Sequence, residues 1–205
     1  MIAIIDYGVG NLFSLKSSFA AIGADTVVTG DPSIIRSAEK LVLPGVGAFG
    51  DAAALLKQNS LDKLVKEEAL NGKPLLGICL GMQLLFDYSL EYGQYEGLGL
   101  IPGSVRPIGD YIPQGYKIPH IGWNALHFPA GKPVSPLFRH IREGDCVYFV
   151  HSFCGAECQE SVIASAEYGA ELTAAVAHEN VYGVQFHPEK SGDVGLNILR
   201  AFCAL

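Results

Sequence analysis

Short apolar runs recur along the first half of the chain and predict buried strands. They occupy residues 2–6, 25–29, 40–43 and 75–78, lengths that suit strands better than helices. Between them, apolar residues recur at helical spacing over residues 12–22 and in the segments leading up to residue 70. Strands that alternate with helices in this way predict a mostly parallel sheet covered on both faces.

The second half of the chain has a different pattern. From residue 93 to about 136 it is rich in Gly, Pro and Tyr and loses the helical spacing, which predicts short strands and loops. Further strand-like runs lie at residues 146–150, 162–168, 173–178 and 181–186, followed by a last helix over residues 192–204. We therefore predict one three-layer α/β domain over residues 1–205, with a mostly parallel central sheet and a smaller antiparallel β portion in the C-terminal half.

A cysteine follows the apolar run at residues 75–78. Gly77 and Gly81 flank Cys79 in a G-x-C-x-G pattern, and residues 80–85 carry apolar positions at helical spacing. A tight strand-to-helix turn with glycines around a central nucleophile predicts a nucleophile elbow, here with a thiol. A helix N-terminus stabilises the thiolate of a cysteine, whose reference pKa is ~8.5. The alternative is that Cys79 is only a small buried apolar residue.

A candidate base lies at the end of the last strand-like run. His187 is followed by Pro188 and Glu189, and the proline disfavours helical geometry for the residue before it. An extended segment would direct His187 and Glu189 to the same side. A carboxylate beside an imidazole fixes its tautomer and stabilises the imidazolium. Together with Cys79, these residues predict a thiol, a general base and an orienting carboxylate for acyl transfer.

Acyl transfer also needs donors for the tetrahedral oxyanion. In a nucleophile elbow one donor is the backbone N–H after the nucleophile, here that of Leu80. The turn Gly45-Val46-Gly47 follows another predicted strand, and ligands bind at the carboxyl ends of parallel strands. We expect this turn to supply the second donor, because its glycines let the backbone approach closely. The turn could instead be only a tight connection into the next helix.

Composition excludes several classes of function. The net charge is −7 and no basic run occurs, which argues against nucleic-acid binding. No apolar segment is long enough to cross a membrane and no signal peptide is evident, so we expect a cytoplasmic protein. Cys154 and Cys158 lack a second ligand pair, and Gly8-Val9-Gly10 lacks the third glycine of a dinucleotide motif. We therefore expect no metal and no cofactor.

The motifs resemble those of class I, triad-type glutamine amidotransferases. Residues 77–83 (GICLGMQ) match the nucleophile motif of that family, and residues 187–189 (HPE) match its base and orienter. The stretches 6–12 (DYGVGNL), 44–49 (PGVGAF) and 121–124 (IGWN) further resemble the glutaminase subunits of imidazole glycerol phosphate synthases. The resemblance extends over the whole chain.

The resemblance implies an activity and a partner. Such subunits hydrolyse L-glutamine to L-glutamate and ammonia, and the ammonia passes to a separate (β/α)8-barrel cyclase subunit in a heterodimer. The cyclase makes imidazole glycerol phosphate and an aminoimidazole carboxamide ribonucleotide in L-histidine biosynthesis. The family also implies that the Val46 peptide rotates to complete the oxyanion hole, which couples hydrolysis to occupancy of the cyclase.

The resemblance also implies two sets of binding residues. Contacts to glutamine fall on Gly45, Gly47, Gln83, Glu91, His151, Ser152 and Phe153. Residues that face the cyclase fall on Asn11, Trp123, Tyr148 and Lys190. The family often has tyrosine where this chain has Phe153, so a contact that needs a hydroxyl would be lost there. From the residues alone, Trp123 could equally be a packed aromatic side chain.

Three other functions remain open from the sequence. A free-standing γ-glutamyl hydrolase would use the same triad without a partner. A regulatory subunit would keep the fold without the chemistry, but the intact Cys79, His187 and Glu189 argue against it. A related amidotransferase of tryptophan, folate or purine synthesis would differ in its acceptor subunit and in the motif at residues 6–12.

Overall fold

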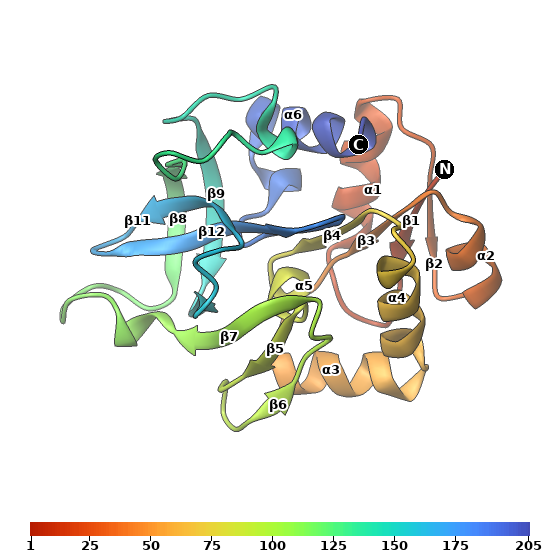
Figure 1. Ribbon diagram of the computed structural model, residues 1–205, viewed down its shortest axis with the longest axis horizontal. Coiled ribbons are helices and arrows are strands. Elements are labelled where there is room, and N and C mark those ends of the chain that lie inside the picture. The colour runs from red at the N-terminus through yellow and green to blue at the C-terminus, as the bar shows by residue number, and fades with distance from the viewer.

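The computed structural model describes residues 1–205 and is organised around a seven-stranded sheet of order β11-β12-β13-β4-β3-β1-β2. The parallel strands are β1 (Ile2–Ile5), β2 (Thr26–Thr29), β3 (Lys40–Leu43), β4 (Leu75–Ile78) and β13 (Val181–Val184). Two antiparallel strands extend it, β12 (Glu171–His178) and β11 (Val162–Glu167). Figure 1 shows this sheet crossing the middle of the molecule.

Helices cover both faces of the sheet. One face carries α1 (Leu12–Ala21) and α6 (Gly192–Cys203); the other carries α2 (Pro32–Ser37), α3 (Phe49–Gln58) and α4 (Leu61–Leu70). Alternate residues of β1 enter different cores, Ile2 and Ile4 facing α1 while Ala3 and Ile5 face the other layer. The two cores hold 23 and 28 buried residues, so both faces are closed, as expected for continuous apolar strands in a parallel sheet.

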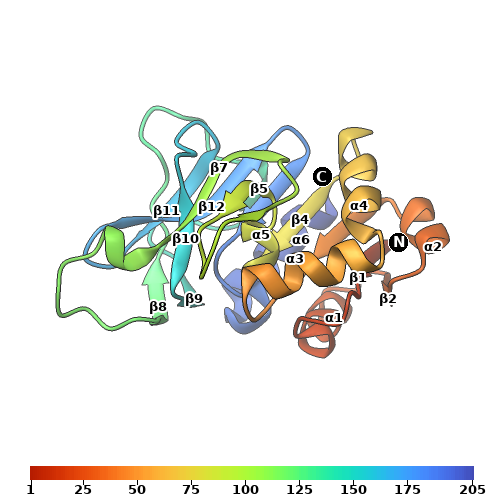
Figure 2. The same ribbon diagram turned by 90° about the horizontal axis from the view of Figure 1, so that it is seen from below.

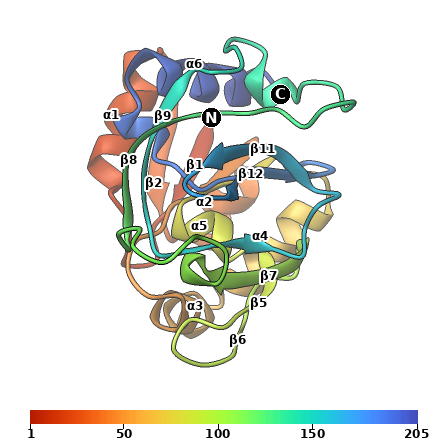
Figure 3. The same ribbon diagram turned by 90° about the vertical axis from the view of Figure 1, so that its left-hand side faces the viewer.

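Two smaller sheets complete the molecule. One has the order β10-β7-β5-β6, formed by Phe153–Ala156, Ile101–Pro107, Phe86–Ser89 and Tyr95–Glu96. The other is an antiparallel ribbon of β8 (His120–Ala125) and β9 (Cys146–His151). In Figure 2 the first sheet lies beside α3, and in Figure 3 the ribbon runs along one side of the molecule. The predicted α/β class, with its parallel centre and antiparallel additions, is confirmed.

Three short 3-10 turns, at Ile108–Asp110, Pro136–Phe138 and Pro188–Lys190, join the other elements. The last of them carries part of the predicted triad. None of the helices is both long and apolar enough to cross a membrane.

Two helices differ from the sequence prediction. The pattern did not indicate α2, which begins with Pro32 and is capped by the Asp31 side chain, an acceptor of the Ser33 N–H at 2.7 Å. The helix predicted from residue 80 through residue 85 is only one turn, α5 (Leu80–Gln83). It ends early because Phe86 already pairs with β7 in the smaller sheet.

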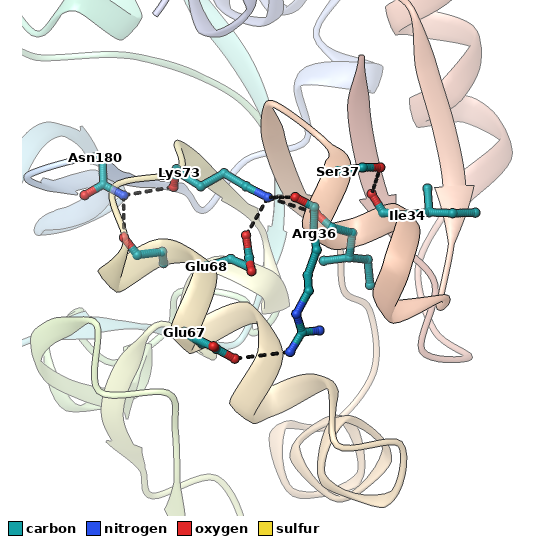
Figure 4. Close-up of polar contacts among 9 residues, drawn as sticks. Ile34, Arg36, Ser37, Glu67, Glu68, Lys73 and Asn180 are labelled. Carbon is teal, nitrogen blue, oxygen red and sulfur yellow. Dashed lines mark hydrogen bonds and ion pairs between the residues drawn. The ribbon is translucent and has the colours of Figure 1, made fainter.

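A polar cluster lies at the end of the sheet where the parallel strands begin (Figure 4). Lys73 Nζ donates to the carbonyls of Ile35 and Arg36 at 3.0 and 2.8 Å, at the C-terminal end of α2. The Asn180 amide donates to the carbonyls of Ala69 and Lys73, both at 2.8 Å. These bonds join α2, α4 and the turn before β13, at the opposite end of the strands from Cys79.

Candidate active site

Cys79 lies between β4 and α5 in a backbone conformation that few residues adopt. Its φ is 55° and its ψ is −112°, a strained geometry that is common at functional turns. The Cys79 N–H donates to the Val184 carbonyl of β13 at 2.8 Å, which holds the turn in place. A Cβ on Gly77 would lie 2.6 Å from the Gly81 carbonyl oxygen. The predicted elbow therefore depends on both flanking glycines.

Gly81 offers a direct test of this packing. A Cβ at this position would overlap the backbone carbonyl of Leu43 in β3, and backbone atoms cannot move aside as a flexible side chain can. We expect Gly81→Ala to destabilise the fold by about 3 kcal/mol or more, measured by urea unfolding. Gly109→Ala is the matched control, because its Cβ would meet only the Ile118 side chain at 3.2 Å. Equal stabilities of the two variants would contradict the packing argument.

His187 and Glu189 form a buried pair. His187 Nδ1 lies 2.8 Å from Glu189 Oε1, and the two side chains are only 4% and 3% exposed. The local geometry differs from the prediction, because Pro188–Lys190 is a 3-10 turn rather than extended chain. The contact nevertheless forms, since the Ser191 hydroxyl donates to the His187 carbonyl at 2.6 Å and fixes the turn. The His187 N–H donates to the Tyr148 carbonyl of β9 at 2.9 Å.

The imidazole lines the same cleft as the Cys79 thiol. Its Nδ1 is occupied by Glu189, which leaves the other ring nitrogen without a carboxylate partner. Burial by itself would lower the pKa of His187. The hydrogen bonds to Cys79 and Glu189, together with the negative charges of these groups, outweigh burial and raise the pKa of His187 to about 9. The site therefore favours the protonated form of His187.

The turn Gly45-Val46-Gly47 lies against the elbow. A Cβ on Gly45 would be 2.8 Å from the Gly81 nitrogen and 2.9 Å from Leu80 Cβ, so the two turns are in direct contact. Val46 is 44% exposed and Gly47 has a φ of 100°. The buried Tyr7 hydroxyl donates to the Pro44 carbonyl at 2.8 Å and supports the turn from behind. Burial, followed by the negative charge of Cys79, raises the pKa of Tyr7.

One cleft of about 390 Å³ brings most of the predicted site residues together. It is lined by Val46, Gly47, Cys79, Leu80, Gln83, Glu91, Pro119, Val150, His151, Ser152, Phe153, His187 and Lys190. Its size is in the range of small-molecule sites. Of the residues predicted to contact glutamine, only Gly45 is absent from the lining, because it packs beneath its neighbours against Gly81.

Buried polar side chains hold part of the cleft wall in place. Gln83 Nε2 donates to the Phe153 carbonyl at 3.1 Å. Glu91 Oε2 accepts the Phe49 N–H at 2.6 Å, at the start of α3. Burial raises the pKa of Glu91, against the opposing effect of that hydrogen bond, and the charge of Asp51 raises it further. A carboxylate is thus held at the edge of the cleft.

His151 lines the same cleft, is almost completely buried, and belongs to a chain of hydrogen bonds. Its Nδ1 lies 2.8 Å from the Phe153 carbonyl and its Nε2 lies 3.0 Å from His120 Nδ1. Burial lowers the pKa of His151 to about 4, and the charges of His120 and His187 act in the same direction. His151 therefore supports the cleft as a neutral ring that orders the backbone of residues 151–153.

Three of the four predicted partner-facing residues gather on one surface. Trp123 on β8 is 55% exposed, which rules out the interpretation as a packed core residue. Its ring meets that of Tyr148 edge-on at a centroid distance of 6.0 Å, and Lys190 Nζ lies 5.8 Å from the Tyr148 ring centroid. Asn11 lies at the start of α1, where its side chain accepts the Ser14 N–H at 3.4 Å. Its position caps the helix, as its residue type predicts.

The sequence interpretation did not identify Gln185. This residue is completely buried, and its Nε2 lies 3.8 Å from Cys79 Sγ. A signal was present in the sequence, because a glutamine interrupts the apolar run and lies two residues before His187. Alternate residues of an extended segment share a side.

No three His, Cys, Asp or Glu side chains lie close enough together to hold a metal ion.

Comparison with known proteins defines the class of this fold and site. Residues 3–204 match the family "Glutamine amidotransferase class-I". Among solved structures, the chain is similar to one described as a glutamine amidotransferase, with a TM-score of 0.75, 17% identity, and 99% and 100% of the two chains covered. PurLQS from Thermotoga maritima has a TM-score of 0.74, 19% identity, and coverages of 99% and 97%. These two structures support the fold, and the family match defines the class as glutamine amidotransferase.

Relatives with higher sequence identity than these structures define the family more precisely. The imidazole glycerol phosphate synthase subunit HisH of Sulfurimonas denitrificans is 48% identical over 98% of this chain and 97% of its own length. The HisH subunit of Moorella thermoacetica is 48% identical, with coverages of 98% and 93%, and that of a Geobacillus species 47%, with coverages of 100% and 97%. The chain belongs to this HisH family of class I glutamine amidotransferases. It is therefore an enzyme subunit of the glutamine amidotransferase class that acts in histidine biosynthesis.

Proposed function

We propose that this chain hydrolyses L-glutamine to L-glutamate and ammonia with a triad of Cys79, His187 and Glu189. The observation that carries the proposal is that Cys79 and His187 line one cleft while the buried Glu189 contacts His187 Nδ1 at 2.8 Å. Residues 1–205 would act as one amidotransferase domain, because the strands that carry the triad belong to one sheet.

The reaction follows from these positions. The thiol proton of Cys79 already resides on His187 when substrate binds, and the resulting thiolate attacks the side-chain amide carbon of glutamine. The resulting imidazolium, stabilised by Glu189, returns its proton to the departing nitrogen, so that ammonia leaves and a thioester remains. His187 then activates a water molecule that hydrolyses the thioester. Glutamate is released and the thiol is restored.

The oxyanion formed in each half of the reaction needs two donors. The N–H of Leu80 follows the nucleophile at the elbow, where donors of this kind are found. The Val46 peptide lies in the turn that touches the elbow, and Gly47 beside it adopts a φ of 100° that other residues rarely reach. Glycine on both sides permits the Val46 peptide to rotate. We assign Val46 as the second donor, available once that peptide points its N–H into the cleft.

The part of the cleft wall that carries Gln83 and Glu91 would bind the amino-acid end of glutamine. Gln83 offers an amide and Glu91 a carboxylate suited to an ammonium group. The backbone of Ser152 and Phe153 lines the same wall and needs no tyrosine hydroxyl for main-chain contacts. The replacement of the common tyrosine by Phe153 is compatible with this arrangement.

The ammonia would pass to a cyclase subunit with a (β/α)8 barrel, the partner expected of a HisH subunit. The exposed Trp123, packed edge-on against Tyr148, supports this, because aromatic side chains are enriched at protein interfaces. Lys190 also lines the cleft. The proposed interface and the proposed active site therefore share a residue.

Glutamine hydrolysis with and without the partner tests this proposal. We expect the isolated chain to be slow and the complex with cyclase and its nucleotide to be faster by about 5–150-fold, the usual range of coupling between sites. Trp123→Ala should weaken binding of the cyclase, whereas Leu70→Ala, at an exposed leucine at the end of α4, serves as a control away from the proposed interface. Full activity of the isolated chain would contradict the coupling and favour a free-standing γ-glutamyl hydrolase.

A further inference from the structure

Gln185 is a buried polar residue that the proposed mechanism leaves without a role. It follows β13 directly, and its backbone N–H donates to the Ala174 carbonyl at 2.8 Å. Its neighbours Val184 and Phe186 are packed in the core, and Gln185 itself is 0% exposed. A carboxamide buried this completely needs hydrogen-bond partners, because an unpartnered one costs about 1–3 kcal/mol.

Its partners determine which way the amide is turned. Gln83 Nε2 lies 3.1 Å from the Phe153 carbonyl, which can only accept, so this end of Gln83 is its donor end. The same Nε2 lies 3.0 Å from the near atom of Gln185, which must therefore be the acceptor Oε1. The remaining Nε2 of Gln185 then faces Cys79 Sγ at 3.8 Å. The N–H is thus directed at the sulfur by the hydrogen-bond network itself.

We propose that Gln185 is a positioning residue that holds the thiolate of Cys79. Its N–H donates to the sulfur at 3.8 Å, and His187 lines the same cleft as Cys79. A donor stabilises the charged thiolate over the neutral thiol. It also keeps the sulfur from rotating away from the position in which it attacks. This proposal rests on the proposed function, because it assumes that Cys79 is the nucleophile.

The network also connects the sulfur to the wall of the cleft. Gln83 and Phe153 line the proposed glutamine site, and two hydrogen bonds lead from there to Gln185. A shift of the Phe153 carbonyl or of the Gln83 amide would change the orientation of the Gln185 amide. Gln185 therefore couples the binding wall to the position of the nucleophile.

The pH dependence of thiol alkylation tests this role without glutamine or partner. Iodoacetamide labelling of Cys79 is followed by peptide mass spectrometry, which separates it from the exposed Cys146. In Gln185→Met, which removes the donor and keeps the length, we expect the midpoint of labelling to rise by about 0.5–1 pH unit. In Gln185→Glu, whose carboxylate would face the sulfur, the rise should be larger. For glutamine hydrolysis we expect kcat to fall and KM to stay close to that of the parent chain.

Ser104→Ala is the control for loss of a buried polar group, because Ser104 bonds Glu157 far from the cleft and should leave the labelling profile unchanged. An unchanged profile in either folded Gln185 variant would overturn the proposal. If Gln185→Met does not fold, the near-isosteric Gln185→Glu alone decides. The proposed function fails separately, if Cys79→Ala still hydrolyses glutamine.

Discussion

Replacing Cys79 with alanine is expected to lower glutamine hydrolysis by about 10⁵–10⁶-fold, the scale of loss when a triad nucleophile is removed. The thiol lines the same cleft as His187, and alanine in its place leaves no group to form a thioester. Release of glutamate, measured with a coupled dehydrogenase, gives the rate.

Two further measurements test whether the loss of glutamine hydrolysis comes from the missing thiol alone. Because alanine is slightly smaller than cysteine, the thermal unfolding temperature and binding to the cyclase should stay close to those of the parent chain. Cys146→Ala removes an exposed cysteine at the start of β9 and should keep full activity. Glutaminase activity that persisted in Cys79→Ala would overturn the assignment of the nucleophile.

Glu189→Gln should lower kcat by about 10³–10⁴-fold with little change in KM, by comparison with the effect of removing the orienting carboxylate in other triads. The carboxylate accepts from His187 Nδ1 at 2.8 Å inside the core. An amide in its place can turn its NH₂ toward the ring, which would select the wrong tautomer for accepting the thiol proton.

The same variant should change how stability depends on pH. Folding raises the pKa of His187 from ~6.5 in an unfolded chain to about 9. The protonated ring therefore stabilises the native state fully below about pH 6.5, and this stabilisation is lost as the pH rises through about 9. Without the Glu189 charge this decline should be smaller, as measured by urea unfolding between pH 6 and pH 10.

An exposed His–Glu pair provides the matched control. His127 and Glu171 are 2.9 Å apart, but their side chains are 41% and 53% exposed. Glu171→Gln should leave the rate of hydrolysis unchanged and alter the pH dependence of stability little, because exposed pairs contribute little. Similar pH profiles for Glu189→Gln and the parent chain would show that Glu189 does not tune His187.

The sequence predicted those parts of the molecule that local patterns determine. The strand at residues 75–78, the glycines around Cys79 and the short His-Pro-Glu segment all carry their geometry in neighbouring residues. The alternation of strands and helices predicted the sheet, and strand ends indicated where the cleft would lie. Even so, the reason given for the His187–Glu189 contact was wrong, because Pro188 begins a 3-10 turn and not an extended segment.

Features that depend on distant pairing were missed. The helix after Cys79 stops at Gln83 because residue 86 pairs with β7, and nothing within residues 80–85 marks that stop. The six-residue α2 is too short to show a clear apolar period. In the sequence, Gln185 has the pattern of an ordinary polar residue. Only the pairing of β13 with β4 brings its amide to the sulfur of Cys79.

The pairing of β4 with β13, which aligns Ile78 with Val184, has a consequence for synthesis of the protein. Cys79 leaves the ribosome long before His187, and the two meet only after the last strand of the sheet has been inserted beside β4. A nascent or truncated chain therefore lacks the proposed base beside its thiol. Under the proposed mechanism, ammonia formation begins only when translation has nearly finished and the sheet has closed.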